Sequence, residues 1–431
     1  MRRQRASSVA VVLIVMETVS CIAGCETAHP GWRGSVRDSA GVLLVRNEGT
    51  PLWSPGEEWT LSEVLRIGST AGPPKTMFGR IKGIAVLSDG RIVVNDAMAQ
   101  ELRVFYPSGE YQMTIGGPGA GPGEFGPGGL TLLVGAGDTL LVIDLSNLRA
   151  NRIAPDGTWL DSWSLAPSEG WLFRDWDDSG TGRIASHMAR VPGMERSAGD
   201  TFDVVVVRNL DGTPGDTLAW IAASRLRRRS TGGQPEFHFY SGEPDMDLCS
   251  DKSLVAGRGD VYRIYWYEPS GTLERVVTLE RPGEPITADD RAFIERRFDE
   301  TLRKARISVE RINSMKDAIR FTDYYPAFGQ LECGPHGTLW AWRIKPLGSL
   351  GAKAREEFSV TASPEFAPEF DVFDRQGRYL GIVSLPDGFW GSLMRRGHLY
   401  GRWTDSLGVE YVSVLEIRGE PPAPMDQGFF D

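Results

Sequence analysis

Short polar runs that end apolar stretches are the first places in this sequence where chemistry could occur. Asn95-Asp96 and Asp144 each close a run of apolar residues, and Asn147 and Asn151 follow soon after. Oxygen-rich side chains around one opening could take calcium, which binds about six to eight oxygen ligands. The same residue types also close loops by accepting hydrogen bonds from backbone amides. Since no calcium-loop spacing is present, we predict no metal site or cofactor, keep calcium as an alternative, and treat Asn95, Asp96 and Asp144 as candidate ligand-binding residues.

Basic residues gather in two other places. One run holds Arg227, Arg228 and Arg229, and the other is centred on Arg297. Guanidinium groups match carboxylates and phosphates, so these four arginines are candidates for binding an anionic ligand. Acidic residues are interspersed around Arg297 at helical spacing, however, and we favour an ordinary solvated surface of weak ion pairs there.

Catalytic residues cannot be assigned from the sequence. The histidines are scattered, at His29, His187, His238, His336 and His398. The chain contains no nucleophile elbow, phosphate-binding loop, zinc-protease motif or paired C-x-x-C motif.

A repeated glycine indicates the elements that must position these side chains. It falls between the third and fourth of four short apolar strands, at Gly109, Gly157, Gly212, Gly271 and Gly377. Successive glycines in this set are separated by 48, 55, 59 and 106 residues. A period of about 40 to 50 residues with several strands is typical of propeller blades. A second set of turns, between first and second strands, occurs six times, at Asp89-Gly90, Ala136-Gly137, Ser179-Gly180, Asp251-Lys252, His336-Gly337 and Arg396-Gly397. The expected fold class is therefore all-β, a six-bladed β-propeller.

The sixth blade lacks a fourth strand because no strand follows residues 409–417. We predict that an N-terminal strand completes it, either residues 41–47 or residues 60–68. Pairing the two ends of the chain in one blade removes an open sheet edge. Residues 41–431 are thus expected to form a single propeller domain.

Three segments resemble one known family. RDSAGVLLVRN near the N-terminus, FGRIKGIAVLSDGRIVVND, and above all GGPGAGPGEFGPGG at residues 116–129 are similar to bacterial six-bladed β-propeller lipoproteins with NHL-like repeats. The resemblance spans nearly the whole mature chain and implies the six-bladed fold. It implies no catalytic residues.

Long segments all fall on one face of the expected propeller. Second-to-third turns and blade linkers share this face, called here the second face, and the long segments are residues 185–202, 224–237, 281–325 and 345–369. Because function concentrates on elaborated loops, we expect recognition there. Within 281–325, between blades 4 and 5, a capping box at Thr287 and apolar residues three or four apart from Ile294 to Ile319 predict one amphipathic helix. It is expected to cover the second face as a lid, or else to dock a partner.

The N-terminus reads as a lipoprotein signal. Residues 1–24 have a basic start and an apolar run, and end in Ile22-Ala23-Gly24 before Cys25, which would carry the lipid. Residues 25–40 would then be a tether. Cys249 and Cys333 lie at equivalent places in neighbouring blades, either as a disulfide or as two buried thiols.

A net charge of −10 argues against a nucleic-acid partner. From the propeller fold, the long loops and the signal, we expect a binding or scaffolding lipoprotein with a protein, peptide or glycan ligand. It is expected to be a monomer in the bacterial cell envelope, lipid-anchored on the periplasmic or outer surface. It would contact the membrane only through its N-terminal lipid. The alternative is a metal-dependent propeller hydrolase or lyase, of the gluconolactonase-like or amidating-lyase-like type.

Overall fold

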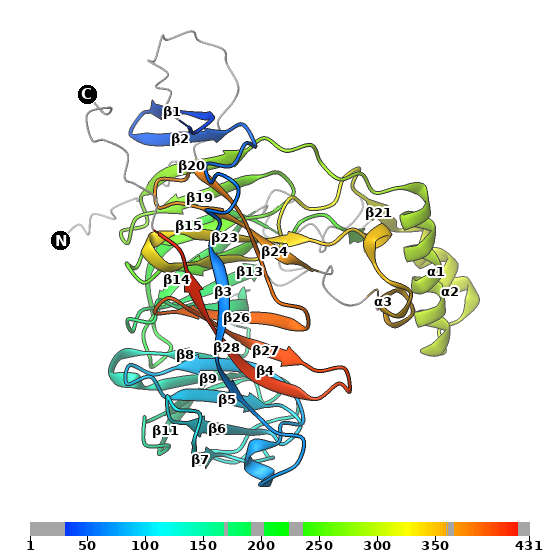
Figure 1. Ribbon diagram of the computed structural model, residues 1–431. Helices are drawn as coiled ribbons and strands as arrows, with labels where there is room; N and C mark the ends of the chain where they lie inside the picture. Colours follow the sequence, from blue (N-terminus) through cyan, green and yellow to red (C-terminus); the bar gives the residue numbers. More distant parts are fainter. Residues whose placement is uncertain are drawn as a thin grey trace, which may run out of the picture.

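Six four-stranded units form a ring in the computed structural model, which describes residues 31–167, 171–190, 202–223, 236–358, 360 and 366–420. The first strand of each unit contacts the first strands of the two neighbouring units, so these six strands surround a central channel. The fold is therefore a six-bladed β-propeller, as the repeat predicts (Figure 1).

The blades are numbered in chain order and are antiparallel. Blade 1 contains β4 (Ile81–Val86), β5 (Ile92–Asp96), β6 (Glu101–Phe105) and β7 (Tyr111–Ile115). Blade 2 contains β8 (Thr131–Val134), β9 (Leu140–Asp144), β10 (Arg149–Ile153) and β11 (Trp159–Ser164). Blade 3 contains β12 (Trp171–Asp178), β13 (Ile184–Arg190), β14 (Phe202–Arg208) and β15 (Pro214–Ala222).

The second half of the ring carries the additions to the fold. Blade 4 contains β17 (Asp245–Leu248), β18 (Leu254–Gly257), β19 (Arg263–Tyr267) and β20 (Leu273–Leu279). Blade 5 contains β22 (Leu331–Cys333), β23 (Leu339–Ile344), β24 (Phe366–Phe373) and β25 (Tyr379–Ser384). Blade 6 contains β26 (Phe389–Arg395), β27 (His398–Thr404), β28 (Glu410–Arg418) and β3 (Thr60–Ile67).

The repeated glycines pack each blade against the one before it. A Cβ added at Gly377 in blade 5 would lie 2.6 Å from a methyl carbon of Val277, on the outer strand of blade 4, and the residue has φ +85°. Such a contact and such a backbone angle both favour glycine. The other four glycines face the outer strand of their own preceding blade in the same way, with Gly109 against Leu65 of β3, Gly157 against Ile115, Gly212 against Trp163 and Gly271 against Leu218.

Strand β3 closes the ring. It pairs antiparallel with β28 from Thr60↔Arg418 to Ile67↔Val412, so the second of the two N-terminal segments completes blade 6. The first segment has a different role: β2 (Val42–Asn47) pairs parallel with β20 on the outside of blade 4, and β1 (Gly34–Ser39) pairs with β2. Trp32 is buried in the same core, and its indole N–H donates to Asn47 Oδ1 at 2.9 Å. The expected tether of residues 25–40 thus contains folded chain from Trp32 onward.

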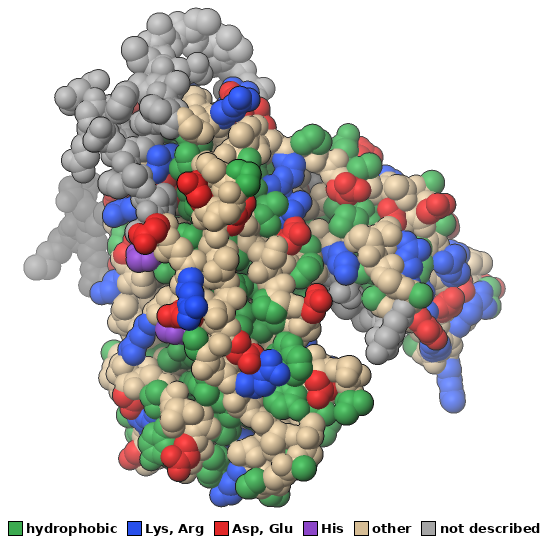
Figure 2. All heavy atoms as spheres, viewed as in Figure 1, with side chains coloured by type: hydrophobic (Ala, Val, Ile, Leu, Met, Phe, Trp, Pro, Cys, Tyr) green, Lys and Arg blue, Asp and Glu red, His purple; other side chains and the backbone are tan. Residues whose placement is uncertain are grey.

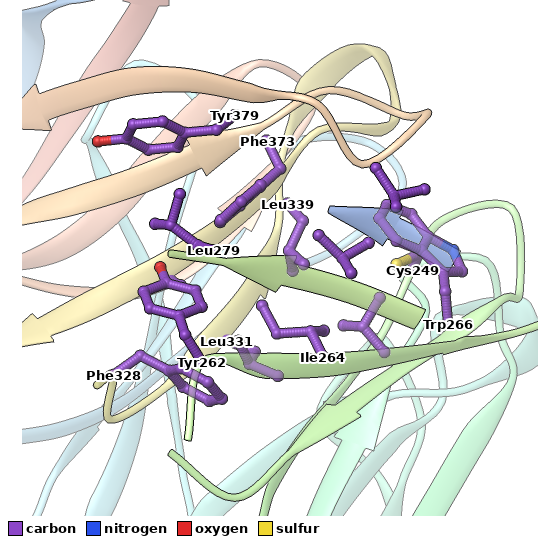
Figure 3. Packing of buried hydrophobic residues seen from close by; sticks show 14 of the residues in the cluster. Cys249, Tyr262, Ile264, Trp266, Leu279, Phe328, Leu331, Leu339, Phe373 and Tyr379 are labelled. Carbon is purple, nitrogen blue, oxygen red and sulfur yellow. The ribbon is translucent and has the colours of Figure 1, made fainter. Parts of the chain in front are cut away.

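Apolar cores fill the spaces between neighbouring blades. Figure 3 shows one of them, where Ile264 and Trp266 of blade 4 pack with Leu339 and Phe373 of blade 5. Alternation along each strand sends side chains to both neighbouring blades, which explains why most strands are apolar throughout.

The insertion between blades 4 and 5 contains two helices instead of the expected single one. α1 (Ala288–Lys304) begins at a capping box between Thr287 and Asp290, and α2 (Val309–Asp317) begins at the N-cap Ser308. The apolar stripe is interrupted because the chain turns at Arg306, with φ +61°, and Ile319 belongs to the short strand β21 (Ile319–Phe321).

The helices do not cover the blades as a flat lid. The buried face of α1, with Phe293 and Ile294, forms a separate small core with Leu347, Leu350 and Phe358. These partners lie around α3 (Ala352–Glu357), and β16 (Phe237–Phe239) pairs parallel with β21 alongside. The assembly, called here the overhang, projects to one side of the ring in Figure 1. It is made from three second-face segments because none of them alone could bury its apolar residues.

Candidate functional site

The sequence-predicted carboxylates close loops. Asp96 is 1% exposed, and its two oxygens accept from the backbone amides of Gly79 at 2.9 Å and Arg80 at 3.0 Å, while Arg103 pairs with it at 3.1 Å. Asp144 is equally buried and accepts from Gly126 N at 2.9 Å and Asn147 N at 3.1 Å. Both carboxylates are thus used inside the protein.

Asn95 links two blades. Its side-chain oxygen accepts from Leu130 N at 3.0 Å, at the entrance to blade 2, and the residue is fully buried. Arg297 also makes internal contacts, because it donates to the carbonyl oxygens of Glu356 and Phe358 and to Glu300, which fixes α1 against α3. The structure therefore does not bring these residues together in a ligand site. Arg227, Arg228, Arg229 and Cys25 lie outside the described residues.

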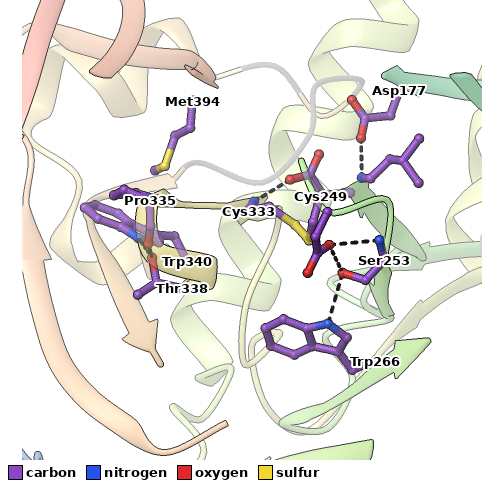
Figure 4. Close-up of a disulfide and its surroundings, with 12 residues drawn as sticks. Asp177, Cys249, Ser253, Trp266, Cys333, Pro335, Thr338, Trp340 and Met394 are labelled. Carbon is purple, nitrogen blue, oxygen red and sulfur yellow. Dashed lines mark hydrogen bonds between the residues drawn. A yellow bond between two sulfur atoms is a disulfide. The ribbon is translucent and has the colours of Figure 1, made fainter. Parts of the chain in front are cut away.

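A disulfide joins Cys249 and Cys333 across blades 4 and 5, with their Cα atoms 5.2 Å apart. The sequence left open a disulfide or two buried thiols, and the structure contains the disulfide. Figure 4 shows it at the ends of the two innermost strands, beside Asp177 of blade 3. The disulfide thus lies at the wall of the central channel.

Carboxyl groups from three blades face this channel. They come from alternate positions of innermost strands and are Asp175, Asp177, Asp245, Asp247 and Glu332. Several receive a backbone N–H from the next blade: Leu331 N donates to Asp245 Oδ2 at 2.6 Å, Leu248 N donates to Asp177, and Cys333 N donates to Asp247. These hydrogen bonds connect blade 3 to blade 4 and blade 4 to blade 5.

Their enclosed position and their mutual repulsion raise the pKa of these groups. Burial is the main cause that raises the pKa of Glu332 to about 8, and the nearby Asp177 and Asp245 charges add to it. The pKa of Asp247 rises to about 7, again chiefly through burial, and burial together with Asp247 raises the pKa of Asp177. Arg395 of blade 6 is the compensating cation and binds Asp178 at 2.9 Å. Near neutral pH, part of this cluster is therefore protonated.

One histidine, His187, is part of a buried pair. His187, which the sequence left without a role, pairs with Asp203 at 2.9 Å inside blade 3, and both are almost fully buried. Within the described ranges, no three His, Cys, Asp or Glu side chains are grouped so that they could hold a metal ion.

A pocket of about 260 Å³ lies between blades 6 and 1. It is lined by Ile81, Lys82, Gly83 and Ile84 of β4, Trp390 of β26 and Arg402 of β27. Trp390 and Arg402 are cross-strand partners near the start of β26 and the end of β27, which places the pocket on the second face. No feature of the sequence singled out Trp390 or Arg402, because the pocket depends on how two distant ends of the chain meet.

The fold defines a class, the six-bladed β-propellers, and comparison with known proteins agrees. Residues 74–127 match the model of a family described as a 6-bladed β-propeller, DUF5128. This match contains the Gly-Pro-Gly-Glu-Phe run of residues 121–125.

Solved structures support the same class. A member of the DUF4221 family from Bacteroides vulgatus has a TM-score of 0.52 and 13% identity, with 84% of this chain and 99% of that chain covered. A putative exported protein from Bacteroides fragilis has a TM-score of 0.50 and 12% identity, with 87% and 99% covered. At these identities the similarity concerns the fold. A search of curated proteins finds no match.

The described residues include no helix that is long and apolar enough to cross a membrane.

Proposed function

We propose that this protein is a ligand-binding propeller of the cell envelope whose recognition surface is the second face. The observation that carries the proposal is that the pocket between blades 6 and 1 opens on the face from which the overhang projects. Figure 2, viewed in the same direction as Figure 1, shows the overhang projecting to one side of the propeller body. The turns between first and second strands on the first face, such as those at Gly90 and Gly397, are tight. Elaborated loops over a rigid scaffold are where ligands are bound.

Attachment through Cys25 is the second part of the proposal. The first core residue, Trp32, follows Cys25 by only a few positions, so a lipid there would hold the propeller close to the membrane surface. Fractionation tests this part. Wild-type protein should sediment with membranes and Cys25→Ser protein should not, and equal sedimentation of both would contradict the anchor.

Hydrogen exchange tests the recognition surface. The protein is measured with and without a soluble glycan and peptide extract of bacterial envelopes. We expect slower exchange in residues 79–84, 389–403 and 288–317, and no change in first-face turns such as residues 87–91 and 135–139. Slower exchange confined to the first-face turns would contradict the proposal.

The metal-dependent hydrolase or lyase remains the weaker alternative. Its candidate ligands Asp96 and Asp144 are occupied by backbone amides. In the described part of the chain, no three His, Cys, Asp or Glu side chains are placed to hold a metal ion together.

A further inference from the structure

The pocket between blades 6 and 1 combines a flat aromatic wall with two cations, and these features define a class of ligand. The inference rests on the proposed binding function and concerns the ligand of that same site.

Arg402 has a free donor in this wall. Its Nη1 donates to Glu410 Oε1 at 3.2 Å, and the other oxygen of Glu410 accepts from Ile81 N at 2.6 Å. The guanidinium is thereby held against blade 1. Its Nε–H is buried and has no hydrogen-bond partner among the described residues. A buried donor without a partner is costly for the folded protein, so a ligand oxygen that reaches this edge of the guanidinium would be favoured.

Lys82 supplies a second cation. It lines the pocket, is exposed and makes no ion pair with any described residue. With Glu410 as the neighbouring anion, Arg402 and Lys82 leave one positive charge in excess. The pocket therefore favours a ligand with a single negative charge, and a carboxylate, which matches a guanidinium edge, carries one such charge.

Trp390 supplies the flat wall. The indole is 38% exposed, yet it packs against Trp342 and Phe366 of blade 5, with ring centroids 4.8 Å and 5.4 Å apart. These contacts fix its orientation, so the free part of the ring is a preformed apolar surface. A ring-shaped ligand can cover such a surface with little loss of entropy.

We propose that this pocket binds one carboxylated sugar ring, such as a hexuronic acid unit, with its carboxylate on Arg402 and Lys82 and its C–H face on Trp390. The volume of about 260 Å³ lies below the range of about 300–1,000 Å³ typical of larger ligands, so a single ring fits. Sugar recognition is favoured over recognition of a nucleotide because Trp390 offers one face and, among the described residues, no second aromatic ring lines the opposite side.

Calorimetry and saturation-transfer NMR test the proposal with D-glucuronate, D-galacturonate, D-glucose and AMP as probes. The two uronates should bind at least tenfold more tightly than glucose. AMP should bind more weakly than either uronate. Equal binding of glucuronate and glucose, or tighter binding of AMP, would overturn the proposal.

Variants locate the site. Trp390→Ala should weaken glucuronate binding at least tenfold, and Lys82→Gln several-fold. Arg402→Lys keeps the charge but removes the Nε–H, and should also cost about tenfold. Matched controls are Trp220→Ala, an indole 56% exposed on β15, and Arg418→Lys on the outer part of blade 6; both should leave binding unchanged. If Arg402→Lys lowers the melting temperature, its loss of binding could reflect loss of folding, and the test of the site then rests on Trp390→Ala. Unchanged binding in Trp390→Ala would reject the site.

Failure of the ligand class and failure of the binding function are distinguishable. Slower exchange on the second face without uronate binding rejects only the sugar. Absence of both rejects the pocket as a recognition site altogether.

Discussion

Cys249 is bonded to Cys333 across the boundary between blades 4 and 5. Each cysteine lies at the end of an innermost strand, where the two blades come close to the channel, and Cys249 is also part of the apolar core between them. The bridge therefore fastens the ring at a boundary far from the one that β3 closes.

Removing the bridge should destabilise the ring. The cysteines are 84 residues apart, and a loop of that length predicts a loss of about 4–5 kcal/mol in the chain-entropy model. We expect Cys249→Ala/Cys333→Ala protein to unfold at lower urea concentration than wild type. Reductant should lower the wild-type midpoint and leave the double variant unchanged, and a wild type insensitive to reductant after full reduction would contradict the prediction.

The channel carboxyls predict that stability falls as pH rises. Folding raises the pKa of Glu332 from 4.5 to about 8 and that of Asp247 from 3.8 to about 7. Between these limits the folded state holds more protons than the unfolded state, so unfolding becomes easier as pH increases. Melting temperatures measured from pH 5 to pH 9 should decline by several degrees, most steeply from pH 5 to pH 7, and should level off above pH 8.

Glu332→Gln should flatten that decline. The amide cannot become charged, so the variant should match or exceed wild-type stability at pH 9 and differ little at pH 5. Glu416→Gln, at a carboxylate 39% exposed on β28, serves as the control. A parallel shift of the whole curve in Glu332→Gln would point to lost packing instead of titration.

The sequence contains a signal for these carboxyls, although none of them was among the candidate residues. Asp175 and Asp177, then Asp245 and Asp247, are Asp-x-Asp pairs in the first strands of blades 3 and 4. Strand alternation places both members of a pair on the same side. Once the strands are assigned to blades, the sequence predicts that the two pairs lie on equivalent sides of neighbouring innermost strands.

The blades were foreseeable from the sequence, whereas the closing strand and the role of Asp96 were not. The repeated glycines predicted the blades because glycine is required where one blade closely approaches the next, as at Gly377. In contrast, residues 41–47 and 60–68 are equally strand-like, and only pairing with β28 or β20 separates them. Asp96 could equally have been a ligand or a loop closure, since both uses need a carboxylate at a strand end. Its four backbone donors decide that question in the structure.

The ion pair between Arg281 and Asp371 is expected to contribute strongly to the stability of the fold. Asp371 is fully buried and binds Arg281 through two 2.7 Å hydrogen bonds, and the hydroxyls of Tyr262 and Tyr379 also donate to it. The two tyrosine rings lie in the core shown in Figure 3. Arg281→Met would leave the buried carboxylate with only Arg343, whose Nε lies 4.0 Å from Asp371 Oδ2, as its cation, and should cost about 3 kcal/mol. Arg281→Met/Asp371→Asn should recover part of that loss in urea unfolding. A double variant no more stable than Arg281→Met would show that the ion pair is not the cause.

Closure of the ring predicts that β3 is essential to the whole fold. Ile67 is 3% exposed and packs with Val412 and Val414 of β28 and with Ile81 of blade 1, so it belongs to the core between the last and first blades. Ile67→Ala should lower the free energy of unfolding by about 2–5 kcal/mol. Val64→Ala, on the same strand but 48% exposed, should change it by less than about 0.5 kcal/mol. Because β3 joins the two ends of the chain, Ile67→Ala should also speed hydrogen exchange in both β28 and β4. Faster exchange confined to β3 would mean that the ring stays closed without it.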